Sequence, residues 1–355
     1  MTAHSLRRTA ASALALLLLT ATAMVSTVPA GASEPSGNVP RFGNVFVIIG
    51  ENTELIQVNR NSMPYFTQEL KPDAAWLRNY WAITHFSTAN YIAMTSGQYT
   101  PCEQFDYKPA RCHQDVPNLF NQLTDAGVSW TAWNESMAAP CSLVNNGASK
   151  TLNHYAVKHD PAVYYDGVVV PEGGTWGVGG PSDLCTDNVI STGDPVAPND
   201  TTDLDAALAS GDVSRFNFIV PNMCEDGHDT CPPTPPSALG QFDQFLAREV
   251  PKILASPAWD EDSLLIVTFD EGASTAGGGS SADGTPCTAW DSCPNAFHGG
   301  GRVAFAAVGD MVIPGSDYWA HADHYGLLRT LEEGFGLSTF VGAADKATPI
   351  TEIWG

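Results

Sequence analysis

The chain has 355 residues and carries 39 acidic against 16 basic side chains, which gives a formal net charge of −23 at pH 7. A protein this acidic does not hold nucleic acid or an anionic membrane surface by general electrostatic attraction. An anionic substrate would therefore need local positive charge from a metal ion or from a few specific cationic side chains.

The first 32 residues have the pattern of a secretory signal peptide. Arg7 and Arg8 precede a long apolar run, and residues 30–32 are small, as at a cleavage site. We therefore expect residues 33–355 to form the exported protein, as a single catalytic domain. No later segment reaches the roughly 18 consecutive apolar residues of a spanning helix, so we expect no membrane span.

The eight cysteines of this exported chain indicate disulfide-bonded surface loops. They occur as close sequential pairs, and no C-x-x-C spacing of a zinc–thiolate site is present. We predict the bridges Cys102–Cys112, Cys141–Cys185, Cys224–Cys231 and Cys287–Cys293.

Short apolar, β-branched runs alternate with helical patterns along the chain. This alternation predicts an α/β fold with a mostly parallel central sheet and helices on both faces. The expected strands are 44–50, 128–133, 215–221, 263–269 and 302–309. The expected helical segments are 117–127, 201–211, 237–256 and 324–335. Segments 166–201 and 272–300 are rich in Gly, Pro, Ser and Asp, which predicts long surface loops.

Polar residues follow four of the expected strands directly. They are Glu51-Asn52, Asn134-Glu135, Asn222 with the segment 225–229, and Asp270-Glu271. Such residues also begin loops and cap helices, and any one cluster has that explanation. Because the carboxyl ends of parallel strands meet at one edge of a sheet, the four together favour a common site there.

The pairs Glu51-Asn52 and Asp270-Glu271 offer only oxygen ligands. Carboxylates packed together either raise one another's pKa or hold a cation. Oxygen ligands suit Ca²⁺, Mg²⁺ or Mn²⁺. Two of these carboxylates would also suit the acid/base pair of a glycosidase, but the asparagine and nearby hydroxyls favour a metal.

The segment 84–97, THFSTANYIAMTSG, predicts a helix that begins near Thr88 and ends at Gly97. Ser87 would lie at its N-terminus, where free N–H groups and the helix dipole favour an anion. A serine at this place is also an ordinary N-cap, with a contribution of about 1 kcal/mol. The window alone leaves both explanations open.

Several histidines stand beside other polar residues at expected strand or helix ends, in a chain that has few lysines and arginines. They can supply local positive charge and proton donors. They are His85, His159, His228, His298 and His324.

Seven motifs in order resemble the bacterial and fungal phosphoesterase family, which contains acid phosphatases and bacterial phospholipases C and belongs to the alkaline phosphatase superfamily. The resemblance spans nearly the whole exported chain. The motifs are GENT (50–53), HFSTANYIAMTSG (85–97), WNESM (133–137), VKHDPAVYY (157–165), IVPNMCEDGHD (219–229), VTFDEG (267–272), and HGGGRV (298–303) with HADHYGLLRTLEE (321–333).

The resemblance implies a serine nucleophile within a pattern H-P-S-x-P-N-Y. Aligned by its histidine and its Asn-Tyr pair, that serine is Ser87. The two prolines of the pattern are replaced by Phe86 and Ala89, which leaves Thr88 as the alternative nucleophile. The spacing favours Ser87.

The resemblance also implies one divalent metal ion, with Ca, Mg, Mn and Zn not distinguished. The implied ligands are Glu51, Asn52, Ser87, Asp270 and Glu271. Asp226, His228 and His324 are an alternative set for a second ion. The implied catalytic residues are Ser87, His228, His298 and His324, and the substrate-binding residues are His85, Asn90, Lys158, His159 and Asp226.

These expectations describe a secreted, metal-dependent phosphomonoesterase of acid-phosphatase type that acts on a phosphate ester through a phosphoserine. A phospholipase C-type phosphodiesterase would share these residues, and exposed Trp176 and Trp290 in the long loops would favour it. A non-catalytic calcium-binding surface protein is the alternative from another class. A serine esterase is disfavoured, because the chain has no G-x-S-x-G elbow.

Overall fold

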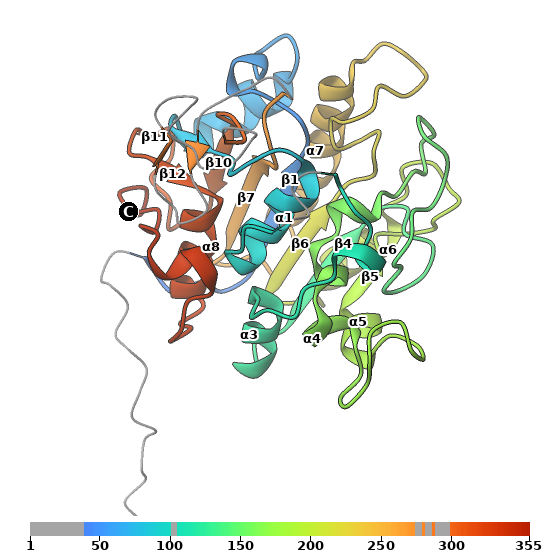
Figure 1. Ribbon diagram of the computed structural model, residues 1–355. Coiled ribbons are helices and arrows are strands. Elements are labelled where there is room, and N and C mark those ends of the chain that lie inside the picture. Colours follow the sequence, from blue (N-terminus) through green and yellow to red (C-terminus); the bar gives the residue numbers. More distant parts are fainter. Residues whose placement is uncertain (1–38, 101–104, 274–278, 281–285, 288–298) are drawn as a thin grey trace, which may run out of the picture. The chain divides into compact units, whose positions relative to one another are not determined.

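The computed structural model describes residues 39–100, 105–273, 279–280, 286–287 and 299–355, and the predicted signal peptide lies outside them. Its central feature is an eight-stranded sheet with the order β11-β2-β10-β7-β1-β6-β4-β5 (Figure 1). The strands are β1 (Val45–Gly50), β2 (Ala75–Leu77), β4 (Trp130–Asn134), β5 (Val189–Ser191), β6 (Phe216–Val220), β7 (Leu264–Phe269), β10 (Phe305–Val308) and β11 (Asp317–Tyr318).

The sheet is mostly parallel, as predicted. β1 pairs in parallel with β6 and β7, and β4 pairs in parallel with β6 and β5. β10 is antiparallel to both β7 and β2. Every residue of β1, β6 and β7 is buried, which explains why these strands read as continuous apolar runs rather than as alternating patterns.

The four predicted helices and the helix after Ser87 are present, although their bounds differ by a few residues from those expected. The α-helices are α1 (Ser87–Ser96), α2 (Pro109–Cys112), α3 (Leu119–Asp125), α4 (Asp166–Val169), α5 (Asp183–Asn188), α6 (Thr202–Ser210), α7 (Ala238–Leu254) and α8 (His324–Gly334). Small two-stranded sheets pair β3 (Tyr80–Trp81) with β12 (Ala322–Asp323) and β8 (Gly279–Ser280) with β9 (Pro286–Cys287). Among the described residues, no helix is both long and apolar enough to span a bilayer.

Helices cover both faces of the sheet. Phe218, beside Val47 in the register, packs against Tyr91 of α1, with ring centroids 6.3 Å apart. Phe269, beside Gly50, packs against Phe242 of α7 at 5.3 Å. Positions 47 and 50 of one strand point to opposite faces, so α1 and α7 lie on opposite sides. In Figure 1, α1 lies in front of the central strands, and α8 lies to its left.

Gly50 ends β1 at the point where α7 comes closest. A Cβ at this position would lie 2.4 Å from Phe242 and 2.7 Å from Phe269. Glycine is therefore required for the close packing of α7 immediately before the predicted ligand Glu51.

The prediction that 166–201 is a loop is wrong in part, because this segment contains α4, α5 and the edge strand β5. α5 begins where the Ser182 hydroxyl accepts a hydrogen bond from the backbone N–H of Cys185. Glycine- and proline-rich flanks conceal such short elements in the sequence. Much of 272–300 lies outside the described residues.

Two predicted disulfides are confirmed, Cys141–Cys185 and Cys224–Cys231. The first ties α5 to the chain after β4, and the second closes the loop after β6. The other two predicted pairs involve Cys102 and Cys293, which lie outside the described residues.

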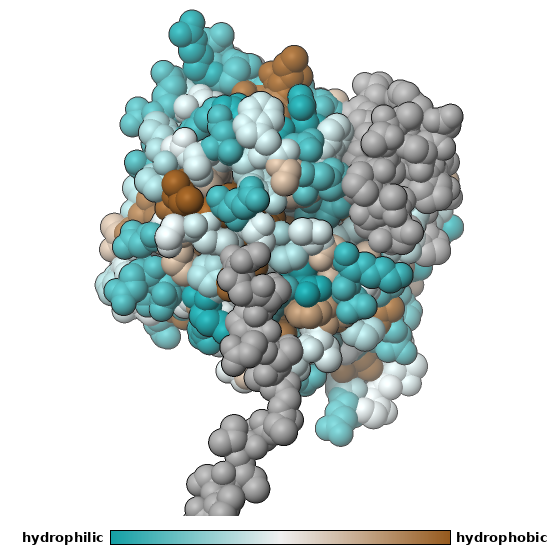
Figure 2. Space-filling model, turned by 90° about the vertical axis from the view of Figure 1, so that its left-hand side faces the viewer, coloured by the Kyte–Doolittle hydropathy of each residue, from teal (hydrophilic) through white to brown (hydrophobic). Residues whose placement is uncertain are grey.

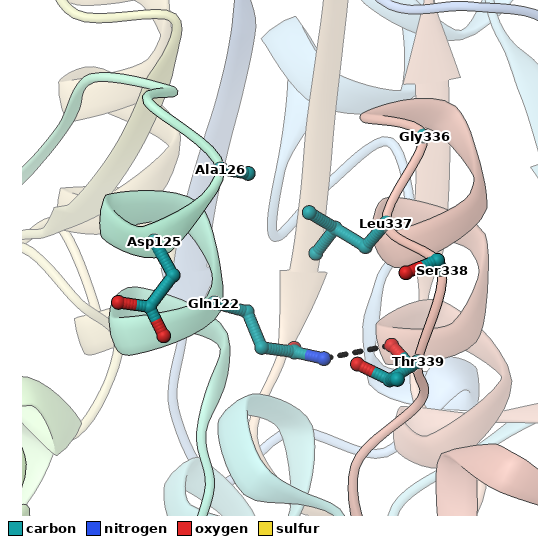
Figure 3. A pocket seen from close by; sticks show the side chains of 7 residues that line it. All are labelled: Gln122, Asp125, Ala126, Gly336, Leu337, Ser338 and Thr339. Carbon is teal, nitrogen blue, oxygen red and sulfur yellow. Dashed lines mark hydrogen bonds between the residues drawn. The ribbon is translucent and has the colours of Figure 1, made fainter. Parts of the chain in front are cut away.

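A hollow of about 270 Å³ separates the end of α3 from the chain that follows α8 (Figure 3). Gln122 of α3 reaches across it and donates its Nε2 hydrogen to the carbonyl oxygen of Thr339, at 2.8 Å. Nearby, Glu332 of α8 accepts a hydrogen bond from the backbone N–H of Val341 at 2.8 Å. Burial raises the pKa of Glu332 to about 8, although the bonds from Val341 and Gln122 oppose the shift.

We predict that Glu332 makes the folded protein less stable as the pH rises. Its folded pKa of about 8 lies above the ordinary value of 4.5, so the folded state holds a proton that the unfolded state releases between these pH values. The contribution of Glu332 to the stability of the fold is therefore most favourable below pH 4.5 and declines up to pH 8. Glu332→Gln should gain about 1–3 kcal/mol of unfolding free energy over wild type at pH 8.5, and little at pH 4.5.

Urea unfolding at both pH values, with disulfides intact, measures this difference. Glu172→Gln, at an exposed position, is the matched control. An equal effect of Glu332→Gln at the two pH values would contradict the prediction.

Candidate active site

Glu51 connects the end of β1 to α1. Its side chain is fully buried, and its backbone N–H donates to the carbonyl oxygen of Asp226 at 2.8 Å. Oε1 accepts a hydrogen bond from the Tyr91 hydroxyl at 2.9 Å. Oε2 accepts from Ser87 Oγ at 3.0 Å and from Asn52 Nδ2 at 3.1 Å. This carboxylate therefore holds the hydroxyl of Ser87 directly.

Ser87 is the first residue of α1, and Phe86 at the preceding N-cap position supplies no side-chain cap. The neighbouring Thr88 hydroxyl contacts the carbonyl oxygen of Lys158 at 3.3 Å. Of these two hydroxyls, the one on Ser87 thus faces the carboxylate, whereas the one on Thr88 faces the backbone.

Asn90 fixes the chain that leads to Ser87. Its Oδ1 accepts hydrogen bonds from the backbone N–H groups of Ile83 and Thr84, at 3.0 and 3.1 Å. Its Nδ2 donates to the carbonyl oxygens of Thr84 and Phe86, at 2.8 and 3.2 Å. The sequence predicted a substrate contact for Asn90, but these four bonds engage its amide with the backbone.

Asp270 and Glu271 follow β7 and lie beside the end of β1. Asp270 Oδ1 accepts from the backbone N–H of Asn52 at 3.0 Å, and its Oδ2 is buried with no hydrogen-bond partner. Glu271 pairs through Oε2 with Nδ1 of His85, two residues before Ser87. Its carbonyl oxygen accepts from the backbone N–H of Thr53 at 2.8 Å. The structure therefore joins both predicted ligand pairs at one edge of the sheet.

His159, at the end of a 3₁₀ turn (Val157–His159), lies between two carboxylates. Its Nε2 is 3.1 Å from Oε1 of Glu51, and its Nδ1 is 3.1 Å from Oδ2 of Asp226. Glu51, His159 and His228 each offer one ligand atom, and these atoms all lie within 4.8 Å of one another. This group can hold a metal ion.

The sequence resemblance assigned His159 to substrate binding and did not place it among the candidate metal ligands. Its signal is weak, because it lies in a short turn far along the chain from the carboxylates. The Lys-His-Asp run at 158–160 was the available indication.

The site concentrates buried negative charge on Glu51, Asp226, Asp270 and Glu271. Burial is the main cause that raises the pKa of each carboxyl, and repulsion by Asp270 adds to the shift for Glu51. The pKa of Asp270 reaches about 8 through burial and the charge of Glu271. Oδ2 of Asp270 is buried without a hydrogen-bond partner, whereas Oδ2 of Asp226 faces Nδ1 of His159. Clustered carboxylates with unused oxygens fit a hard divalent cation.

Lys158 is a half-buried cation of this site. Its Nζ donates to Oδ2 of Asp106 at 3.1 Å and lies 3.3 Å from Nε2 of His228. Burial alone would lower the pKa of Lys158, but the charges of Glu51 and Asp106 raise it above its ordinary value. Lys158 therefore stays protonated and, together with burial, lowers the pKa of His159 and of His228. Neutral imidazoles are the form that binds metals.

His324, the first residue of α8, supports the Asp270 backbone. Its Nε2 lies 2.6 Å from the carbonyl oxygen of Asp270, and its Nδ1 lies 2.9 Å from the Tyr80 hydroxyl. Burial lowers the pKa of His324 to about 4. A neutral ring must then donate from Nε2 to the carbonyl and accept at Nδ1 from Tyr80. These contacts favour a positioning role over the catalytic one that the resemblance implied, while His298 lies outside the described residues.

Asn134-Glu135, the remaining group of the four that follow strands, supports the loop after β6 instead of joining the carboxylate cluster. Glu135 Oε2 accepts from the backbone N–H of Asn222 at 2.8 Å. Both terminal nitrogens of Arg248, on α7, donate hydrogen bonds to the carboxylate of Glu225 in the same loop. This network holds the segment that carries Asp226 and His228.

The sequence profile of the Phosphoesterase family matches residues 44–338. The chain belongs to the Phosphoesterase family. This phosphoesterase is 27% identical over 320 residues to a phosphatidylinositol-3-phosphatase of Mycobacterium tuberculosis, across 89% of this chain and 84% of that protein. It is 28% identical to a probable acid phosphatase of Kluyveromyces lactis, across 65% of this chain and 48% of that protein. It thus spans about half the length of this fungal relative.

Solved structures share the fold. The phosphoesterase matches an alkaline phosphatase superfamily protein of Vibrio parahaemolyticus with a TM-score of 0.53 and 13% identity, across 86% of this chain and 69% of the other. It also matches murine ectonucleotide pyrophosphatase / phosphodiesterase 5 with a TM-score of 0.51 and 11% identity, across 85% and 97%. Family membership and the acid phosphatase relatives make the protein a phosphoric ester hydrolase.

We predict that a divalent cation stabilises the protein through the buried carboxylates. Mg²⁺, Ca²⁺, Mn²⁺ or Zn²⁺ added to chelator-treated protein should raise the melting temperature, because a bound cation offsets the repulsion within the cluster. Asp270→Asn should abolish most of this rise. In chelator the same variant should melt at or above the wild-type temperature, because it replaces a carboxyl whose ionised form is costly in this buried cluster and keeps an acceptor for the Asn52 N–H.

Thermal unfolding with metal analysis by mass spectrometry measures both effects. Asp125→Asn, at an exposed position on α3, controls for general charge. An equal cation-induced rise in Asp270→Asn and wild type would exclude Asp270 from the metal site.

Proposed function

We propose that this phosphoesterase is a secreted, metal-dependent phosphomonoesterase of acid-phosphatase type that acts through a phosphoserine at Ser87. The observation that carries the proposal is the hydrogen bond from Ser87 Oγ, on the first residue of α1, to Glu51 within the buried carboxylate cluster. A hydroxyl between a helix N-terminus and an acidic cluster suits a nucleophile whose target is a phosphoryl group.

Glu51, Asn52, Asp270 and Glu271 are the proposed protein ligands of one divalent ion, with Ser87 beside them. The group of Glu51, His159 and His228 supplies nitrogen ligands, either to the same ion or to a second one. A bound divalent ion would supply Lewis acidity, which lowers the pKa of the serine hydroxyl and offsets charge on the phosphoryl oxygens.

The remaining proposed roles follow from the contacts of each side chain. Glu51 orients Ser87 Oγ for attack on phosphorus. Lys158, which stays protonated, balances charge on the phosphoryl oxygens. His228 is partly buried beside Lys158, and where it does not bind the ion it is the proposed proton donor to the leaving alkoxide; it must then be protonated against the lowering of its pKa by burial and by Lys158. His85, Asn90 and His324 are proposed positioning residues: Asn90 and His324 bond to backbone groups, and His85 pairs with Glu271.

Monoesters are favoured over diesters as the substrate class. The relatives in the comparison carry the names of monoester phosphatases, one for a phosphoinositide and others for acid phosphatases. Trp176, a candidate lipid contact if exposed, is half-buried and stacks on His113 with ring centroids 4.3 Å apart. Trp290 lies outside the described residues. A phospholipase C-type activity remains the second candidate because it would use the same serine and metal ligands.

Secretion is part of the proposal and rests on the leader pattern of residues 1–32 and on the disulfides. A purely calcium-binding role would not account for the hydrogen bond from Ser87 Oγ to Glu51.

We predict that Ser87→Ala lowers the release of p-nitrophenol from its phosphate monoester by about 10³-fold or more, because the covalent route is lost. A chelator should also abolish the wild-type activity, and added divalent cation should restore it. Ser96→Ala, a buried serine at the other end of α1, should retain near-normal turnover.

Assays with an aryl phosphodiester and an aryl carboxylic ester, on the same samples, separate the alternatives. Cleavage of the diester alone would favour a phospholipase C-type activity. Wild-type turnover in Ser87→Ala would show that the nucleophile assignment is wrong, and Thr88→Ala would then test the neighbouring hydroxyl.

A further inference from the structure

A carboxylate from another part of the chain lies at the N-terminus of α1. Asp106 Oδ1 accepts a hydrogen bond from the backbone N–H of Thr88 at 3.0 Å, and its Oδ2 accepts one from Lys158 Nζ at 3.1 Å. Asp106 thus uses both oxygens to bridge a helix N–H and a lysine ammonium. Both donors lie beside Ser87, since Thr88 is the next residue and the Thr88 hydroxyl touches the Lys158 backbone.

These two donors suit two oxygens of a phosphoryl group. A backbone N–H in the first turn of a ten-residue helix favours an anion, and an ammonium group adds a full positive charge. The Phe86 side chain cannot accept from this N–H, so α1 has no cap of its own. The Asp106 carboxylate therefore fills a place that a phosphate could also fill.

The position of Asp106 allows its side chain to leave. Its side chain is 21% exposed, in contrast to the fully buried carboxylate of Glu51. Its neighbour Phe105 is 60% exposed. Once displaced, the Asp106 charge can be solvated by water, so exchange with an incoming anion leaves no unpaired charge buried.

We propose that Asp106 is an internal competitor of the substrate phosphate, which must displace its carboxylate from Thr88 N–H and Lys158 Nζ to reach Ser87. The inference rests on the proposed function, because it takes Ser87 as the reacting group. Asp106 then determines affinity: it stabilises the empty site, weakens the binding of every phosphate ester and product, and contributes little to the chemical step.

Asp106→Asn tests the proposal with little risk to the fold. Asp106 has a φ of 44°, a conformation that asparagine also tolerates. The amide can still accept from Thr88 N–H, but it no longer attracts Lys158. The fraction of molecules with a free phosphate position should therefore rise, and the apparent affinity should rise with it.

We expect Asp106→Asn to lower the KM for p-nitrophenyl phosphate and the inhibition constant of inorganic phosphate by about three- to tenfold, with kcat within about twofold of wild type. Asp125→Asn, which removes one exposed charge on α3, corrects for the general repulsion of anions. An unchanged or raised KM, or a large loss of kcat, would overturn the proposal and show that Asp106 instead positions Lys158.

Calorimetric titration with inorganic phosphate separates failure of this inference from failure of the proposed function. If the wild type hydrolyses no phosphate ester, the proposed function fails, but tighter phosphate binding by Asp106→Asn would still support competition at this position. Equal phosphate affinities of the variant and wild type would refute the competition whether or not the enzyme turns over.

Discussion

The burial of several carboxylates at one edge of a parallel sheet is the constraint on which the site depends. Glu51 and Asp270 directly follow the neighbouring strands β1 and β7. Asp226 lies beside them because the backbone N–H of Glu51 donates to the Asp226 carbonyl oxygen. Removing such charges from water costs several kcal/mol each unless hydrogen bonds or a cation compensate. Donors from Tyr91, Ser87 and Asn52 compensate Glu51 only in part, and Oδ2 of Asp270 stays without a hydrogen-bond partner. The incomplete compensation is what suits the cluster to a metal.

Contacts from surrounding elements keep these charges in place. His324 and Tyr80 hold the carbonyl of Asp270, Asn90 holds the turn before Ser87, and Arg248 holds Glu225 beside Asp226. Each supporting group comes from a different part of the chain. The arrangement therefore depends on α1, α7 and α8 packing correctly on the sheet, and not on the motif segments alone.

The sequence predicted the strands well because their signal is local. The runs that became β1, β6 and β7 are buried on both faces and therefore continuously apolar. The convergence of Glu51, Asp226 and Asp270 followed from the rule that parallel strands share a carboxyl edge. The tertiary partners could not be predicted in this way. Nothing local shows that Asn90 and His324 are engaged by backbone groups, that His159 lies between two carboxylates, or that Asn134-Glu135 supports a neighbouring loop.

The net negative charge repels anionic substrates, whereas the site has to bind a phosphate. The affinity for phosphate therefore depends on groups within the site. A net charge of −23 repels anions at long range, and screening at physiological salt confines that effect to about 8 Å. Within that distance of Ser87, the binding of a phosphate depends on which hydrogen-bond donors and positive charges are free to contact it. Burial keeps His159 and His228 neutral, so Lys158 and the N-terminus of α1 carry much of the positive potential. Because Asp106 contacts both, a single solvent-accessible carboxylate sets how much of that potential an incoming phosphate meets.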